Sequence, residues 1–157
     1  MIAPPIRRAT DADAATVAAL NAHVQGWHAA HYPAAFFATP DPVALEAHFR
    51  QRLADPAVTC LLAGDPAQGY ALCSLQERPL SVFSPAVRRL MVDQIAVAPP
   101  ARRQGLGRAL LAAARALARE AGCDEILLDT WEANTEAHRF FQANGFAPRR
   151  MLFRAEP

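Results

Sequence analysis

The stretch that most constrains this chain runs from Val92 to Leu111 and has the pattern of a strand, a tight turn and a helix. Its strand half is apolar and ends at Pro99-Pro100, because proline cannot continue a sheet ladder. From Leu106 onward, apolar residues recur with the spacing of one helical face. This pattern ends at Gly122, a residue type that commonly terminates helices. The sequence therefore predicts a strand, a turn rich in glycine and arginine, and a long amphipathic helix.

The turn between these two elements has the features of an anion site. Gly105 and Gly107, one residue apart, let the backbone approach a ligand closely, although a flexible lead-in to the helix would explain them equally well. The helix N-terminus offers unpaired N–H groups and a partial positive charge, and Arg102, Arg103 and Arg108 add full charges. A phosphate or pyrophosphate would be stabilised there. The spacing fits neither the P-loop nor the dinucleotide pattern, because a leucine stands where the latter needs its third glycine.

The motif Arg102-x-x-Gly105-x-Gly107 resembles the pyrophosphate-binding signature of the GNAT superfamily, the acyl-CoA-dependent N-acyltransferases. Three flanking segments resemble the family's fourth strand, its fifth strand and the helix and turn that follow: Gln94–Pro99, Ile126–Asp129 and Asn134–Phe146. These motifs occur in the family's order and cover residues 90–147. The resemblance implies an N-acetyltransferase that uses acetyl-CoA.

The order of the expected elements indicates a mixed α/β fold. Helices alternate with strands only in the second half of the chain, whereas the first half contains a hairpin, which suits a mixed sheet with helices on both faces. The resemblance implies a three-layer α-β-α GNAT fold in which strands four and five are parallel. We expect strands at 6–9, 58–63, 69–77, about 88–97, 126–129 and 146–154, and helices from about 11 to 28–30, at 43–54, from 106 to about 121, and at 135–144. With 157 residues, the chain is predicted to form one domain, residues 1–157.

Composition excludes several classes of function. The net charge of +1 gives no field that would favour nucleic acid or an anionic membrane. No signal-peptide core and no apolar run of membrane-spanning length is present. The three scattered cysteines favour a reducing compartment, so we expect a cytoplasmic protein.

The end of the first helix is rich in histidine and aromatic residues. His23, His28 and His31 lack the carboxylate or thiolate that would complete a metal set, so no metal is expected. In GNAT enzymes this region often walls the acceptor pocket, and the aromatic residues just after it would suit such a wall or, equally, the core: Tyr32, Phe36 and Phe37.

The resemblance implies where acetyl-CoA binds. The thioester and pantetheine arm would lie against the backbone of Ile95, Ala96 and Val97. The pyrophosphate would take the backbone of the turn: Arg102, Arg103, Gln104, Gly105, Leu106, Gly107 and Arg108. Asn134 and Phe141 match family positions near the thiol end of CoA.

Amine acylation requires a deprotonated amine, because an alkyl ammonium cannot attack the thioester. Its pKa of ~10.4 means that the amine is protonated at neutral pH. Asp93 is the first candidate for the base, because strand alternation predicts that it shares a face with Ile95 and Val97. Its alternative role is a structural partner for Arg88 or Arg89. Glu77 is the second candidate, with a solvated charge at a strand end as its alternative.

The expected acid of the family is missing, because Phe141 stands where the family usually has a tyrosine.

From the resemblance we predict a GNAT N-acetyltransferase that transfers acetyl from acetyl-CoA to a primary amine by direct attack in a ternary complex. The alternative is a non-catalytic acyl-CoA-binding sensor or regulatory module, and a preference for longer acyl chains is a third possibility. The sequence does not identify the amine. Members of the family are often dimers, so a homodimer is possible, although no interface signature is visible.

Overall fold

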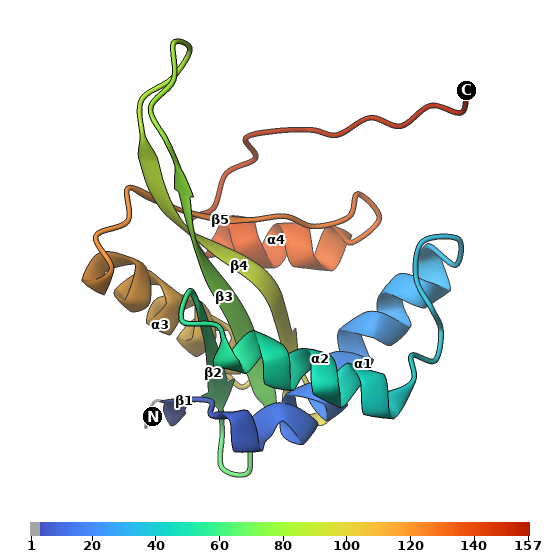
Figure 1. Ribbon diagram of the computed structural model, residues 1–157. Helices are drawn as coiled ribbons and strands as arrows, with labels where there is room; N and C mark the ends of the chain where they lie inside the picture. Colours follow the sequence, from blue (N-terminus) through green and yellow to red (C-terminus); the bar gives the residue numbers. More distant parts are fainter. Residues whose placement is uncertain (1–3) are drawn as a thin grey trace.

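The computed structural model describes residues 4–157 and contains a five-stranded sheet (Figure 1). The strands are β1 (Ile6–Arg8), β2 (Val58–Ala63), β3 (Gly69–Arg78), β4 (Val87–Val97) and β5 (Glu125–Leu128). They lie in sequence order across the sheet. Neighbours are antiparallel except for β4 and β5, which are parallel. The predicted mixed sheet with strands four and five parallel is confirmed.

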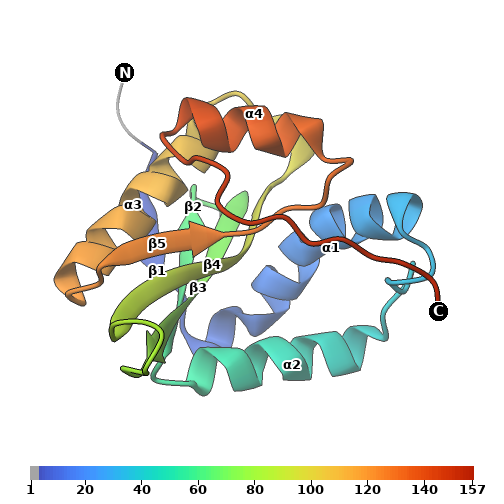
Figure 2. The same ribbon diagram turned by 90° about the horizontal axis from the view of Figure 1, so that it is seen from above.

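Four α-helices cover the two faces of this sheet, as Figures 1 and 2 show. They are α1 (Ala14–His31), α2 (Pro42–Ala54), α3 (Leu106–Glu120) and α4 (Thr135–Ala143). Short 3-10 turns at Asp11–Asp13 and Pro99–Ala101 precede α1 and α3. One core lies between the sheet and α3, and a second lies between the sheet and the α1–α2 pair. The fold therefore has three layers, and each apolar helix face is buried against one side of the sheet.

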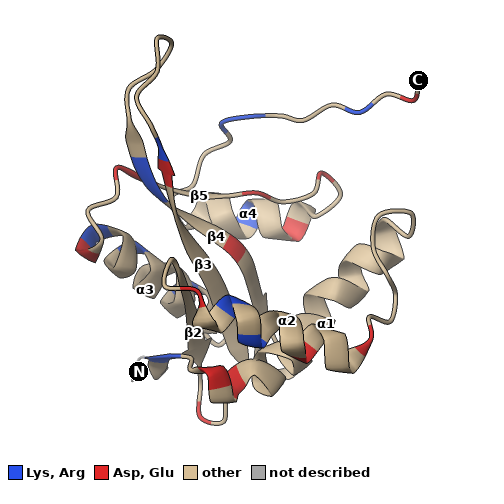
Figure 3. Cartoon of the chain, in the orientation of Figure 1, with Lys and Arg blue, Asp and Glu red and all other residues tan. Residues whose placement is uncertain are grey.

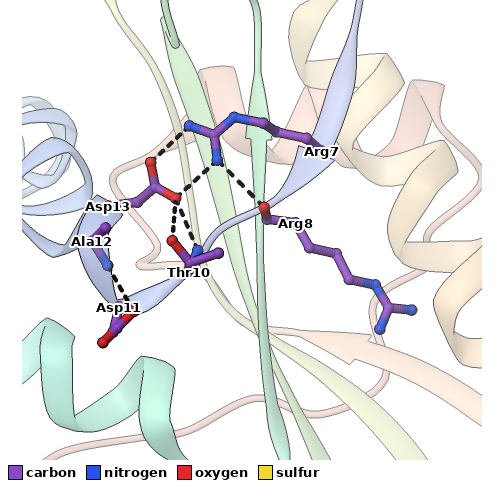
Figure 4. A network of polar contacts seen from close by, with 6 residues as sticks. All are labelled: Arg7, Arg8, Thr10, Asp11, Ala12 and Asp13. Atoms are coloured by element: carbon purple, nitrogen blue, oxygen red, sulfur yellow. Dashed lines mark hydrogen bonds and ion pairs between the residues drawn. The ribbon is translucent and has the colours of Figure 1, made fainter.

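The junction between β1 and α1 is fixed by one carboxylate (Figure 4). Asp13 accepts two hydrogen bonds from the Arg7 guanidinium, at 2.7 and 2.8 Å, and one from the Thr10 backbone N–H at 2.8 Å. These bonds favour the charged carboxylate, so they hold the pKa of Asp13 far below its usual range. Thr10 begins this turn, and α1 follows it without a break.

The last expected strand is a correction. Residues 146–154 form no strand, and the chain from residue 147 to 157 is exposed and extended. Phe146 packs against Phe141, so the segment leaves the body just after this contact. A strand requires a partner edge, and the segment lies away from the sheet in Figures 1 and 2. The other expected elements are present, and their ends differ from the expected ones by three residues at most.

Candidate acyl-transfer site

The sheet opens between β4 and β5 halfway along β4. The parallel pairing of the two strands ends at Val92 and Leu128, so residues 93–97 have no partner in β5. On the opposite edge, β4 stays paired with β3 as far as Val97. The Ala98 N–H donates to the Gln68 carbonyl at 2.8 Å. Because antiparallel bonding alternates along a strand, the peptide groups of Ile95 and Val97 face the opening.

A β-bulge lies at the start of this opening. Val92 pairs with Cys73 and Gln94 pairs with Leu72, so Asp93 is the extra residue in β4. A bulge places two successive side chains on one face. Ile95 and Val97 pack on the α3 side of the sheet, as Val92 does. Asp93 and Gln94 both face the α1–α2 side, as their contacts show.

The expectation that Asp93 shares a face with Ile95 and Val97 is therefore wrong, because the bulge reverses the alternation. The carboxylate accepts a hydrogen bond from Arg52 of α2 at 2.9 Å, and both side chains are about one quarter to one third exposed. The expected alternative partners, Arg88 and Arg89, do not contact it. Figure 3 shows the acidic segment of β4 beside the basic segment of α2.

The second candidate base lies far from the opening. Glu77 pairs with Arg88 across the β3–β4 ladder and forms an ion pair with it at 3.6 Å. The opening is at the level of Ala71, which pairs with Ile95. Six residues of strand separate Ala71 from Glu77, which is about 20 Å at ~3.3 Å per residue. The strand-end role of Glu77 is therefore the one the geometry supports.

The turn before α3 adopts an unusual backbone. Gly105 has φ +86°, which L-residues avoid, and Arg103 has φ +61°. A Cβ added at Gly105 would meet no atom within 4 Å, so this side of the turn is open. The first-turn N–H groups of α3 have no intrahelical acceptor. Open backbone, free donors and three arginines together suit an anion.

One arginine of the turn also holds the strand end. Arg102 donates from Nε to the Val97 carbonyl at 3.2 Å, and Gln104 donates to the Pro100 carbonyl at 3.0 Å. These bonds tie the turn to the end of β4. The turn before α3 and the open strand edge are therefore one connected structure.

The second glycine of the motif has a packing role. A Cβ at Gly107 would lie 3.0 Å from the ring of Phe140, so glycine allows α4 to approach α3. Phe141, the next residue, is buried and packs its ring 5.4 Å from Phe140 and 6.1 Å from Phe146. Asn134 caps α4, accepting from the Ala137 N–H at 3.1 Å. The CoA contacts expected of Asn134 and Phe141 stay predictions.

A buried polar network that the sequence did not reveal braces the bulge. The Tyr70 hydroxyl donates to Gln94 Oε1 at 2.8 Å, and Asn21 Nδ2 donates to the Tyr70 oxygen at 3.0 Å. Burial raises the pKa of the Tyr70 hydroxyl, so this group is not a ready proton donor at neutral pH. The network joins α1, β3 and β4 beside the opening.

Aromatic rings from distant parts of the chain meet at the end of α1. The ring centroid of Trp131, in the loop after β5, lies 4.3 Å from that of Tyr32 and 5.3 Å from that of Phe36. His28 stacks on Phe36 at 4.6 Å, and burial lowers its pKa. The Tyr32 hydroxyl accepts from the Ala133 N–H at 3.2 Å. We call Trp27, His28, His31, Tyr32, Phe36 and Trp131 the aromatic cluster.

The aromatic cluster contains two of the three predicted wall residues, Tyr32 and Phe36, but not Phe37. Phe37 is 82% exposed and joins no ring contact.

Within residues 4–157, no three His, Cys, Asp or Glu side chains come together as a metal set would require. In the same range, no helix has the length and hydropathy needed to cross a bilayer.

Comparisons with known proteins agree with this geometry. The model of the acetyltransferase (GNAT) family matches residues 22–146. A tetramutant of the BH1408 protein from Bacillus halodurans is 22% identical, with a TM-score of 0.89 over 100% of both chains. A candidate acetyltransferase from Arthrobacter sp. FB24 is 33% identical over 100% of this chain and 96% of that one, with a TM-score of 0.73.

A third solved structure is the aminoglycoside N-acetyltransferase AAC(6')-Iy in complex with CoA. It is 22% identical over 98% of this chain and 94% of its own, with a TM-score of 0.76. No curated protein sequence matches the chain. The family model covers most of the chain, and the structural likeness supports the same fold. The chain is therefore an acyltransferase that belongs to the GNAT family.

Proposed function

We propose that residues 1–157 form one domain that transfers an acetyl group from acetyl-CoA to a primary amine by direct attack in a ternary complex. The observation that carries this proposal is the connection of two features by the Arg102–Val97 bond. The first is the unpaired edge of β4, and the second is the anion-binding turn before α3. One ligand with a pyrophosphate and a thioester would engage both.

The donor would enter from the α3 side. Its pyrophosphate would accept hydrogen bonds from the turn at residues 102–108, and its pantetheine arm would run along the free edge of β4. The Ile95 and Val97 peptide groups face the same opening. An N–H group held there would stabilise the oxyanion that forms when the amine attacks the thioester.

The acceptor would approach from the α1–α2 side, where the bulge places Asp93. At neutral pH the amine is present as an ammonium with a pKa of ~10.4, so a base must take its proton before attack. Asp93 would do so directly or through a water. Its hydrogen bond with Arg52 orients the carboxylate on that side.

Direct attack is preferred over an acyl-enzyme because the buried thiols are poor nucleophiles. Burial raises the pKa of both Cys60 and Cys73 to about 12. The thiolate is the reactive form of cysteine, so neither thiol would accept an acetyl group readily at neutral pH. Cys123 lies at the far end of α3, just past the helix that begins at the turn.

The acceptor is an amine of unassigned structure. The aminoglycoside N-acetyltransferases among the similar structures act on amines, which supports this class of acceptor. In this chain the aromatic cluster would form the apolar wall of the acceptor side. We place the enzyme in the cytoplasm, because its scattered free thiols suit a reducing compartment.

The test combines acetyl-CoA binding with turnover. Acetyl-CoA at a hundredfold excess over Kd should add about 2.7 kcal/mol to the free energy of unfolding, which raises Tm by roughly 5–10 °C. Release of free CoA thiol with a panel of amines should then follow. The chain contains no lysine, so no lysine amine of the enzyme contributes to the signal. Absence of a thermal shift at millimolar acetyl-CoA would overturn the proposal.

A second candidate function is a non-catalytic acyl-CoA sensor. Phe141 favours it, because a phenylalanine cannot donate the proton that the family's tyrosine supplies. The two functions differ in turnover alone. A sensor would show the thermal shift without thiol release for any amine, whereas the enzyme would show both.

A further inference from the structure

The bulge in β4 presents two successive side chains to the acceptor side. Asp93 and Gln94 both face the α1–α2 side of the sheet, because Asp93 is the extra residue of the strand. With Asp93 as the base, the reacting nitrogen of the acceptor would lie beside its carboxylate. Gln94 would then lie beside the next atoms of the same molecule. The acyl-transfer mechanism described above gives Gln94 no role of its own.

A buried network holds the Gln94 amide in one orientation. Its Oε1 accepts hydrogen bonds from the Tyr70 hydroxyl at 2.8 Å and from Asn21 Nδ2 at 3.3 Å. Tyr70 is fully buried and Asn21 is 5% exposed, so both partners are fixed by the core. The amide cannot turn without breaking both bonds. A group held in this way has lost its side-chain freedom before a ligand arrives, which lowers the cost of binding.

The network leaves one donor and one acceptor without a protein partner. Among the described residues, Gln94 Nε2 donates to no acceptor and Asn21 Oδ1 receives no donor. Neither atom is sealed from solvent, because the sealed and partnerless side-chain atoms of this part of the chain are the Nε atoms of Arg78 and Arg89. Turning both amides over would exchange the two free atoms and still leave one donor and one acceptor.

Helix α1 connects these two free atoms with the aromatic cluster. His28, a member of the cluster, follows Asn21 by seven residues in α1. Seven residues are two helical turns, so the two side chains lie on one face, about 10 Å apart at ~1.5 Å per residue. This face of α1 therefore runs from the free amide atoms to the aromatic rings. A ligand along it would meet polar atoms near Asp93 and apolar surface farther away.

We propose that Gln94 and Asn21 select the acceptor, which is a primary amine with a neutral carboxamide or hydroxyl group on the neighbouring carbon. This inference rests on the proposed function, because it takes Asp93 as the base for the amine. A carboxamide or a hydroxyl both donates and accepts hydrogen bonds, so either group can pair with both free atoms. An amine with only hydrocarbon at that carbon would take water from the two atoms and give them no partner, which is unfavourable.

The test compares two amines that differ in this neighbouring group. Phenylalaninamide carries a carboxamide beside its primary amine, and 2-phenylethylamine carries hydrogen there. Both contain the same ring, so their contact with the aromatic cluster is matched. The measured quantity is the ratio of kcat/KM for phenylalaninamide to kcat/KM for 2-phenylethylamine, followed by release of CoA thiol. The two amines also differ in basicity, but this difference is common to all variants and cancels when ratios are compared.

Three variants separate selection from structural damage. Gln94→Leu should lower the ratio by about tenfold or more, because it removes the free donor. Gln76→Leu is the matched control: Gln76 is exposed on β3, where it pairs with Arg89, so the same change there should leave the ratio unchanged. Tyr70→Phe keeps the buried ring but releases the Gln94 amide, and should lower the ratio by about threefold or more. A merely structural loss would lower kcat/KM equally for both amines.

The acetyl-CoA thermal shift accompanies each kinetic measurement. Every variant should retain it, which shows that the variant is folded and that its donor site is intact. An unchanged ratio in folded Gln94→Leu or Tyr70→Phe would overturn the inference. So would a wild type that acetylates other amines of the panel but not phenylalaninamide. A wild type with no thermal shift, or with no thiol release for any amine, would overturn the proposed function itself, so the two failures are distinguishable.

Discussion

Replacement of Gly105 by alanine separates ligand binding from backbone strain. Gly105 has φ +86°, and a Cβ built there meets no atom within 4 Å. Gly122, just past the other end of α3, has φ +66° and is equally open. Alanine in the left-handed region costs about 1–2 kcal/mol. Both Gly105→Ala and Gly122→Ala should therefore lower Tm by a few degrees, because about 1 kcal/mol corresponds to ~2–4 °C in a chain of this size.

The two variants should differ in acetyl-CoA binding. The methyl group at Gly105 would occupy the open side of the turn, where the pyrophosphate would lie, and should weaken binding at least tenfold. At an acetyl-CoA concentration of a hundred times the wild-type Kd, the ligand then adds about 1.4 kcal/mol instead of about 2.7. The Gly105→Ala thermal shift should be half that of the wild type or less. The Gly122→Ala shift should equal that of the wild type.

The assay is thermal unfolding with and without acetyl-CoA, supported by calorimetric titration for Kd. Circular dichroism before heating shows that each variant is folded. An unchanged acetyl-CoA shift in folded Gly105→Ala would mean that the phosphates bind elsewhere. An equal loss in both variants would mean that strain in α3, rather than contact with the ligand, controls affinity.

Two further predictions concern catalysis and use kcat with an acceptor found in the amine panel. Asp93→Asn should lower kcat about 10²-fold or more at neutral pH, while Arg52→Gln should stay within tenfold; equal losses would leave Asp93 a structural ion-pair partner. Phe141→Tyr should change kcat less than tenfold, because a thiol of pKa ~8.5 leaves unprotonated at pH 7 for about 2 kcal/mol. A hundredfold gain would instead favour the sensor.

Much of the fold could be predicted because local patterns determine it. Each local pattern predicts one kind of element. The amphipathic stripe of α3 predicts a helix, the apolar run of β2 predicts a strand, and glycines mark the turns. The turn at Gly105 was predicted from residue types, since two glycines stand between an apolar strand pattern and a helical pattern. Its positive φ agrees with that prediction.

The face of Asp93 could not be predicted by assuming regular alternation, although the sequence held a signal. Leu90 and Val92 face the α3 side two residues apart, and Ile95 continues on that side three residues later. This phase shift marks the bulge. Arg52, which pairs with Asp93, lies 41 residues away in the chain, and no local pattern reveals such a contact.

The prediction of a final strand at residues 146–154 was wrong for a different reason. Residues 146–154 have the composition of a strand, but a strand needs an edge to pair with, and composition does not say whose edge that is. The Asn21–Tyr70–Gln94 network was missed because each residue is unremarkable in its own segment. Their contact depends on how α1 crosses β3 and β4.

The aromatic cluster gives this protein an optical property. Trp27 and Trp131 are the two tryptophans of the chain, and both lie in the cluster, each next to Tyr32. Intrinsic fluorescence therefore reports on one side of the molecule, where α1 meets the loop after β5. An amine that settles against these rings should change the emission directly, and candidate acceptors can be screened on the unlabelled protein before any is known to react.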